Sequence, residues 1–424
     1  SGFEPDTSAG RLCVETKERL KEEQDEVRAD VSIPADFGRV YSGESSTQQV
    51  YGMVLTDLSR NLSEISDRVV TLSPDVASST NLGGWINKVG VWSRDLDETL
   101  PSEEISRALN WQEIPEGQHI ELGLSENNLF LMLGQLGLSS EMEGELLYPI
   151  GTLYDPFVRR GMDAFFYSVY SGAKFIVVGT PSGSTLSSEG GSHQSILTPS
   201  IGIEMPDLNS YEPCFGQEVE WILMDALDQI RLRKRSTYLR LSNKRIDQNI
   251  FNVPSDPNAR ERLRLQVLSG AYRLIDRRSE HGYKPGKNVV HIMSCGVMTT
   301  EAVEASMLLL EDGVMANVIN ITGPGPLYEH FQQLVENTIK AKPQLSALMS
   351  DLIGEEERNA PIVTVIDGHP HSMAWMGAAF KTQVLPLGST KFGQSGTMHD
   401  IYKEQGIDLH SIMGACFAAL DLRT

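Results

Sequence analysis

Long apolar runs and closely spaced cysteines are both missing from this sequence. No stretch of about eighteen apolar residues occurs, which argues against a membrane-spanning helix. The N-terminus lacks a basic region followed by an apolar one, so we expect no secretion signal and a cytoplasmic protein. No Cys-x-x-Cys or Cys/His metal spacing occurs, which predicts reduced thiols, no zinc site and no disulfide framework. The four cysteines are Cys13, Cys214, Cys295 and Cys416.

Positive charge is also scarce. Lys and Arg number 36 against 57 Asp and Glu, which gives a formal net charge of −21. Nucleic acids and anionic membranes recruit basic surfaces, so we expect neither as a partner. The 424 residues, 40% of them hydrophobic, are enough for two or three domains with a large buried core.

The pattern along the chain indicates two α/β domains. We expect a charged N-terminal extension over 1–45, a first domain over 46–243, a linker over 244–287 and a second domain over 288–424. In both domains, short apolar strands alternate with longer helices. This pattern is typical of doubly wound, mainly parallel sheets that are covered on both faces.

The expected elements follow from apolar periodicity and turn residues. Strands are expected over 68–73, 119–123, 174–180, 237–241, 288–294, 316–322, 361–367 and 384–388. Helices are expected over 48–62, 125–138, 157–170, 217–230, 301–310, 327–340, 373–380, 397–405 and 409–421.

Two acidic residues follow predicted strands of the first domain. Asp75 lies in Ser73-Pro-Asp-Val-Ala-Ser-Ser, where it either belongs to a ligand site or caps the next element. Glu121 ends a short strand among apolar neighbours, and partial loss of water there suits a carboxylate to proton transfer. The alternative for Glu121 is a cap on the next helix, a role that Glu126 fits better.

Two further segments contain histidine. A Gly/Ser-rich loop starts at Gly179 and ends near His193, which could move protons. The loop lacks the Gly-Lys-Ser/Thr ending of a P-loop, and its residues leave a phosphate cradle and a plain flexible loop equally open. His369 and His371 could suggest a metal, but no third ligand is near in sequence, and we favour a turn after a strand.

Taken in order, four motifs resemble the thiamine diphosphate enzymes of the transketolase and 2-oxo acid dehydrogenase group. They are Ser73-Pro-Asp-Val-Ala-Ser-Ser, Ile120-Glu-Leu-Gly, Gly190-Gly-Ser-His and Phe392-Gly-Gln-Ser. The resemblance runs from about Ala35 to the C-terminus, and each motif is weak alone. Glu189 stands where the family's loop usually has Asp.

The resemblance implies an incomplete enzyme. The family holds the diphosphate and Mg²⁺ in another domain through Gly-Asp-Gly, which this sequence lacks. The chain therefore resembles the β subunit of a split enzyme, or the C-terminal half of a longer one. An α-type subunit would bind the diphosphate and Mg²⁺, and this chain itself would bind no metal. The C-terminal domain would self-associate, and the apolar run over 373–380 motivates that expectation.

The resemblance also implies residue roles. Glu121 would contact the aminopyrimidine ring of thiamine diphosphate and favour its imino tautomer, with Asp75 nearby. Tyr154 or Phe157 would stack on that ring, although core packing is nearly as good an explanation for both. His193 would face the substrate as an acid or base. The remaining substrate contacts would be Glu189, Ser192 and Arg240.

Within the family, Gly179-Thr-x-x-Gly-x-Thr-Leu looks like the decarboxylating component of pyruvate-type dehydrogenase complexes. Transketolases that use sugar phosphates carry Arg after Leu-Ser, where this chain has Asn243, although Arg240 on the same strand face could substitute. We therefore favour a 2-oxo acid decarboxylase and acyl transferase over a sugar-phosphate ketol transferase. A carboligase uses the same chemistry, and a non-catalytic regulatory subunit is the remaining alternative.

Overall fold

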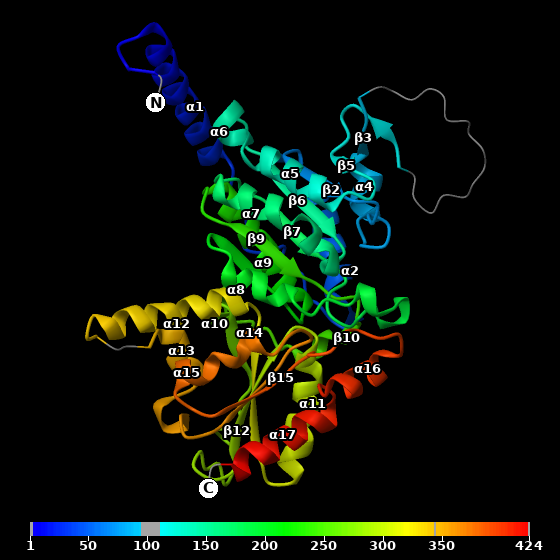
Figure 1. Cartoon of the computed structure of the whole chain (residues 1–424), viewed down its shortest axis with the longest axis vertical. Helices are drawn as coiled ribbons and strands as arrows, with labels where there is room; N and C mark the ends of the chain where they lie inside the picture. The colour runs from blue at the N-terminus through cyan, green and yellow to red at the C-terminus, as the bar shows by residue number, and fades with distance from the viewer. Residues whose placement is uncertain (1–2, 95–110, 343–344, 423–424) are drawn as a thin grey trace, which may run out of the picture.

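The computed structural model describes residues 3–94, 111–342 and 345–422. Figure 1 shows two α/β units, one above the other, with the N-terminal unit at the top and the C-terminal unit below. Each unit is built on its own main sheet, one of eight strands and one of five. The structure therefore confirms the predicted α/β class with two mainly parallel sheets.

The first sheet has the strand order β4-β3-β5-β2-β6-β7-β9-β8, and all its described pairings are parallel. Its strands are β2 (Val69–Ser73), β3 (Val91–Trp92), β4 (Glu113–Ile114), β5 (His119–Glu121), β6 (Tyr148–Leu153), β7 (Ile176–Gly179), β8 (Leu208–Tyr211) and β9 (Ser236–Arg240). Its longer helices are α2 (Thr47–Asn61), α4 (Gly83–Val89), α5 (Glu126–Gly137), α7 (Met162–Tyr170) and α9 (Gly216–Arg231).

Both faces of this sheet are covered, as the uninterrupted apolar strands require. On β7, the side chains of Ile176 and Val178 belong to the core cluster that contains residues of α2 and α9. Val177 points to the opposite face and packs in the cluster that contains residues of α5 and α7. At its start, α2 is fixed by a reciprocal cap between Ser46 and Gln49.

The second sheet has the order β11-β13-β12-β14-β15, in which only the edge strand β11 is antiparallel. Its strands are β11 (Ala271–Ile275), β12 (Val289–Cys295), β13 (Met315–Ile321), β14 (Ile362–Val365) and β15 (Val384–Leu387). The helices around it are α10 (Pro257–Leu268), α11 (Met298–Glu311), α12 (Pro324–Ile339), α13 (Ala347–Leu352), α14 (His371–Ala374), α15 (Met376–Phe380), α16 (Met398–Gln405) and α17 (Leu409–Asp421).

The segments expected outside the two domains take part in ordered structure. The expected linker, 244–287, contains α10 and supplies β11 as an edge of the second sheet. Within the expected N-terminal extension, 1–45, lie helix α1 (Ser8–Asp30) and the short strand β1 (Glu44–Ser45). β1 pairs with β10 (Ile246–Asp247), so the end of the extension lies against the start of the linker.

One expectation about the second unit is corrected. The apolar run 373–380, expected as one helix available for self-association, is divided into α14 and α15. Met373, Met376 and Phe380 are buried in the chain's own core, which leaves these side chains no surface for a second copy. Among the described helices, none has both the length and the apolar character needed to cross a bilayer.

The two units are joined by buried polar contacts. Glu218, in the first turn of α9, accepts hydrogen bonds from the backbone N–H groups of Cys214 and Phe215 at 2.7 and 2.9 Å. Its other carboxylate oxygen accepts from Tyr272 on β11 at 2.7 Å and from Asn320 on β13 at 2.6 Å. A single carboxylate thus connects a helix of the first unit to two strands of the second.

Candidate functional site

The predicted site residues of the first unit lie at the carboxyl ends of adjacent strands. β5, β2, β6 and β7 are neighbours in the sheet, and Glu121, the Asp75 loop, Tyr154 and the Gly/Ser loop follow them in that order. Ligand sites of parallel α/β sheets form at this edge. Topology alone therefore gathers residues that are far apart in sequence.

Glu121 is held in place by a backbone N–H and a buried histidine. Its Oε1 accepts the N–H of Asp75 at 2.7 Å, and its Oε2 lies 3.3 Å from Nε2 of His119. The side chain of His119 is fully buried, whereas that of Glu121 is 26% exposed. The carboxylate is thus anchored from the protein side and open on the other.

His119 is itself oriented by two further side chains. Its Nδ1 lies 2.9 Å from the hydroxyl of Thr71, which accepts the indole N–H of Trp85, also at 2.9 Å. If the Thr71 proton goes to Nδ1, the Nε2–H of His119 points to Glu121, and every donor meets an acceptor. Sequence reasoning missed His119, although the i, i+2 spacing of His119 and Glu121 places both on one face of β5.

The Asp75 loop connects Glu121 to the aromatic part of the site. Asp75 has a φ of 64°, a left-handed conformation that directs its N–H to Glu121. Four residues later, the hydroxyl of Ser79 accepts a hydrogen bond from the phenol hydroxyl of Tyr154 at 3.0 Å. The side chain of Asp75 is exposed, so it can meet a ligand.

Tyr154, Phe157 and His193 form an aromatic cluster. The rings of Tyr154 and Phe157 are stacked with centroids 6.1 Å apart. The imidazole of His193 lies edge-on to both, at 6.1 Å from Tyr154 and 5.6 Å from Phe157. All three side chains are half-buried, so neither Tyr154 nor Phe157 is a core residue. The structure therefore brings Glu121, Asp75, Tyr154, Phe157 and His193 into one set, in which the loop from Asp75 to Ser79 connects Glu121 to the aromatic cluster.

The other loop residues lie at the rim of this set. The hydroxyl of Ser192 is 3.5 Å from Nδ1 of His193, and Ser192 is exposed. Glu189 is exposed as well, in the single turn η2 (Ser187–Glu189). Both side chains are accessible to a ligand that approaches His193.

The loop that carries His193 is held by the second unit. Asp367, which follows β14, accepts the backbone N–H of Ser184 at 2.7 Å and its hydroxyl at 2.8 Å. At the other end of the loop, the amide of Gln194 donates to the carbonyl of Gln394 at 2.7 Å. The position of His193 therefore depends on contacts from both units.

Arg240 was expected to be a donor for a substrate phosphate, and the structure places it elsewhere. It is 3% exposed, and its guanidinium forms ion pairs with Asp155, at 3.2 Å, and with Glu212. It also donates to Ser195 at 3.3 Å and to the carbonyl of Asp367 at 3.4 Å. Its charge is thus compensated by two buried carboxylates. No local sequence pattern indicates these partners.

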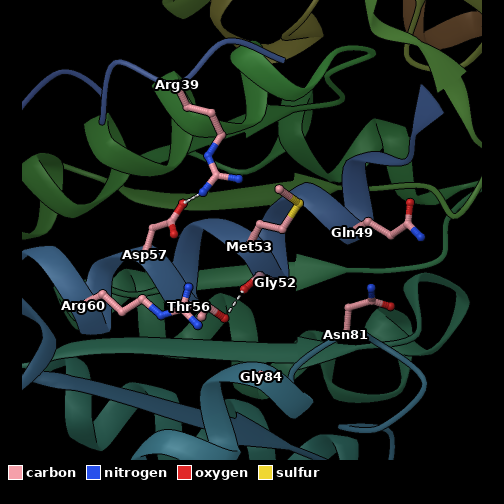
Figure 2. A pocket seen from close by; sticks show the side chains of 9 residues that line it. All are labelled: Arg39, Gln49, Gly52, Met53, Thr56, Asp57, Arg60, Asn81 and Gly84. Atoms are coloured by element: carbon pink, nitrogen blue, oxygen red, sulfur yellow. Dashed lines mark hydrogen bonds and ion pairs between the residues drawn. The ribbon is translucent and has the colours of Figure 1, made fainter. Parts of the chain in front are cut away.

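The histidine pair and the hollow beside α2 lie outside this set of contacts. The Nδ1 atoms of His369 and His371 are 2.8 Å apart, and Nε2 of His371 lies 2.9 Å from Ser200 Oγ. No group of three His, Cys, Asp or Glu residues in the described chain could hold a metal ion. A hollow of about 360 Å³ lies against α2. Figure 2 shows the residues that line it, with Arg39 paired to Asp57. None of the predicted site residues lines that hollow.

Comparison with known proteins agrees with this geometry. The family model "Pyruvate dehydrogenase E1 component middle domain" matches residues 28–248, just over half of the chain. The site thus lies in a domain of the thiamine diphosphate enzyme class, at the carboxyl edge of its parallel sheet. The chain belongs to the pyruvate dehydrogenase E1 component middle-domain family, which confirms the resemblance to the thiamine diphosphate enzymes of the transketolase and 2-oxo acid dehydrogenase group.

Individual relatives are distant and longer. The pyruvate dehydrogenase E1 component of Escherichia coli K12 is 22% identical over 92% of this chain and 43% of its own length. The pyruvate dehydrogenase E1 component of Mycolicibacterium smegmatis is 23% identical over 84% of this chain and 38% of its own length. The chain therefore spans less than half the length of these curated relatives.

Solved structures show the fold. Transketolase from Campylobacter jejuni has a TM-score of 0.67 at 16% identity, covering 98% of this chain and 54% of its own. A structure described as "Split gene transketolase, inactive beta4 tetramer" has a TM-score of 0.58 at 18% identity, covering 90% of this chain and 100% of its own. The chain thus has the fold of the corresponding part of transketolase.

Proposed function

We propose that this chain is the pyrimidine-binding and C-terminal part of a thiamine diphosphate-dependent enzyme that cleaves a 2-oxo acid and transfers the acyl unit. The observation that carries the proposal is Glu121, an anchored carboxylate whose open side faces the edge where ligands bind. The names of the curated relatives, pyruvate dehydrogenase E1 components, support the 2-oxo acid class.

The residues present fit the aminopyrimidine end of the cofactor. Each carboxylate oxygen of Glu121 accepts one hydrogen bond and so keeps capacity for a ring nitrogen proton. The half-buried rings of Tyr154 and Phe157 offer a surface on which an aromatic ring can stack. We assign Asp75 to the rim of the same subsite.

The diphosphate end has no counterpart motif in the sequence, since Gly-Asp-Gly is absent. We assign the diphosphate and Mg²⁺ to a diphosphate-binding α-type partner, and we expect self-association of this chain. The similarity to a chain from a split gene transketolase, covered over its whole length, supports a subunit of this size.

Thiamine diphosphate, when bound, supplies the carbon nucleophile and the electron sink that cleavage beside a carbonyl requires. Glu121 would share a proton with the pyrimidine ring nitrogen, while His119 keeps the carboxylate in position. His193 would give a proton to the substrate carbonyl oxygen or take it back at Nε2. Ser192 and Glu189 would contact the substrate from the rim.

A sugar phosphate is the less favoured substrate because of Arg240. A phosphate needs a free charge-assisted donor, and the guanidinium of Arg240 already meets Asp155 and Glu212. Ketol transfer from a sugar phosphate would need a donor other than Arg240. A 2-oxo acid has no such requirement.

The test is exchange of the thiazolium proton, followed by NMR in deuterated buffer on the enzyme assembled with its partner. Glu121→Gln should slow the exchange by about a hundredfold or more, since an amide cannot share the proton as a carboxylate does. Glu143→Gln, which changes an exposed carboxylate on the neighbouring helix α6 (Ser139–Glu143), is the matched control. Exchange at the native rate in Glu121→Gln would refute the assignment.

The partner requirement is tested separately. The purified chain alone should bind thiamine diphosphate poorly and show no turnover with Mg²⁺ present. Addition of an α-type subunit should restore both. Robust turnover by the isolated chain would disprove the split-enzyme proposal without affecting the role of Glu121.

A further inference from the structure

A second cavity, of about 550 Å³, lies between the end of the first sheet and the loops that follow β14 and β15. Small-molecule sites commonly have this volume. Gln194, the neighbour of His193, is part of the lining, so the cavity adjoins the candidate site. The lining residues that matter here are Pro156, Arg159, Ile196, Leu197, Lys391 and Phe392.

The turn η1 (Asp155–Gly161) separates the two sites. It is a 3₁₀ helix with three residues per turn, so residues three apart share a face. Phe157 and Arg160 share the face toward His193, where Arg160 lies 3.9 Å over the Phe157 ring and pairs with Glu126 at 2.7 Å. Pro156 and Arg159 share the next face and line the cavity.

The cavity is positively charged. Arg159 is exposed and forms no hydrogen bond or ion pair with any described residue. The ammonium of Lys391 donates to the carboxylate of Glu404 at 2.7 Å and to its backbone carbonyl at 3.4 Å, which leaves one of its three N–H donors. None of the described residues that line the cavity is Asp or Glu, in a chain with a net charge of −21. This local excess of cations favours an anionic ligand.

His369 contributes a neutral donor to the same wall. Its Nδ1 accepts the backbone N–H of His371 at 3.3 Å, so the ring proton belongs on Nε2. Burial and the neighbouring imidazole of His371 lower the pKa of His369, which agrees with a neutral ring. The cavity thus offers a hydrogen-bond donor beside its two cations.

The lining also contains uncovered apolar side chains. Phe392 is 93% exposed and Leu197 is 44% exposed. Both lie with Ile196 around the cavity. A ligand with an apolar chain would remove this surface from water, which is the main source of affinity in such sites.

We propose that the cavity binds an organic monocarboxylate, with its carboxylate on Arg159 and Lys391 and its alkyl chain against Leu197 and Phe392. The planar guanidinium matches a carboxylate in shape. One free guanidinium and one shared ammonium balance a single negative charge. The proposal does not depend on the proposed function, since it concerns binding by this chain alone.

The test is calorimetric titration of the purified chain with butyrate, hexanoate and hexanamide. Hexanoate should bind about tenfold more tightly than butyrate because two more methylene groups are buried. Hexanamide, which matches hexanoate in size without the charge, should bind at least about tenfold more weakly.

Variants locate the site. Arg159→Gln should weaken hexanoate binding about tenfold, and Phe392→Ala should abolish the preference for the longer chain. Arg262→Gln, which changes an exposed arginine on α10 outside the cavity, should leave the affinity unchanged. Thermal melts followed by circular dichroism confirm that each variant is folded.

Three results would overturn the proposal. One is the absence of saturable binding at millimolar hexanoate. Another is an equal loss in Arg159→Gln and Arg262→Gln, which would indicate overall charge rather than a site. The third is tighter binding of hexyl phosphate than of hexanoate, which would assign the cavity to phosphate esters.

Discussion

Replacing Arg240 with Met should destabilise the chain strongly, because it removes the cation that pairs with two buried carboxylates. Asp155 and Glu212 are 0% and 5% exposed, and both form ion pairs with Arg240. Asp155 keeps the hydroxyl donors of Tyr238 and Thr198, whereas Glu212 loses its ion-pair partner. Breaking a buried pair on one side costs about 3–5 kcal/mol, and we expect a loss of that size in the free energy of unfolding.

The loss should depend on pH. Burial raises the pKa of Glu212 to about 7 even with Arg240 beside it. Without Arg240 the pKa of Glu212 in the folded state rises further, while a glutamate in the unfolded chain has a pKa of about 4.3. Between these values the folded state binds the extra proton, so the free energy of unfolding falls as pH rises, by up to about 1.4 kcal/mol per pH unit. The free energy of unfolding of Arg240→Met should therefore be lower at pH 8 than at pH 5.5. This difference should exceed the difference between the same two pH values in the parent chain.

The assay is urea unfolding at both pH values, followed by tryptophan fluorescence. The double variant Arg240→Met/Glu212→Gln should recover at least about 1 kcal/mol at pH 8, since the amide carries no charge to bury. Arg262→Gln, on the surface of α10, is the control for the loss of one positive charge. An equal loss at both pH values, together with no recovery in the double variant, would refute the reasoning.

Three more substitutions test other contacts. Glu218→Ala should lower the free energy of unfolding by about 3 kcal/mol or more, because it removes the acceptor of four buried hydrogen bonds; an unchanged urea midpoint would contradict this. Asp367→Asn should speed hydrogen exchange over 183–195, because an amide cannot accept from both donors of Ser184; unchanged exchange there would contradict it. Gly151→Ala should cost about 1–3 kcal/mol, since its Cβ would lie 2.6 Å from a side-chain carbon of α5. Gly414→Ala, whose Cβ meets open space, should cost nothing in the same urea assay.

The strands that the sequence predicted best are those with unbroken apolar runs, such as β7 and β12, because burial on both faces leaves a clear signal. β6 was missed because Pro149 and Gly151 interrupt its pattern. Pro149 is tolerated because the N–H of Tyr148 faces β2, so the nitrogen of Pro149 faces β7, where pairing begins only at Ile150. Gly151 is needed because α5 packs directly on it.

Part of the candidate site could also be predicted. Glu121 was identifiable from its place at a strand end, and the spacing of His119 could have been read in the same way. The partners of Arg240 could not be predicted, because Glu212 and Asp155 lie 28 and 85 residues away from it in the sequence. Such pairs arise only when strands that are distant in sequence become neighbours, and no local pattern encodes them.

The second unit is therefore part of the candidate site and not only an attachment to it. Gly183, at the start of the loop that carries His193, has a φ of 62°, and a Cβ there would lie 2.3 Å from the carboxylate of Asp367. Only glycine allows this approach, and the approach lets Asp367 accept both donors of Ser184. The far end of the loop is held by Gln194 against Gln394, near a cavity to which both units contribute. A loop fixed at both ends by another unit has few conformations to lose when a ligand binds, so the second sheet would favour the proposed binding at His193 without contacting the ligand there.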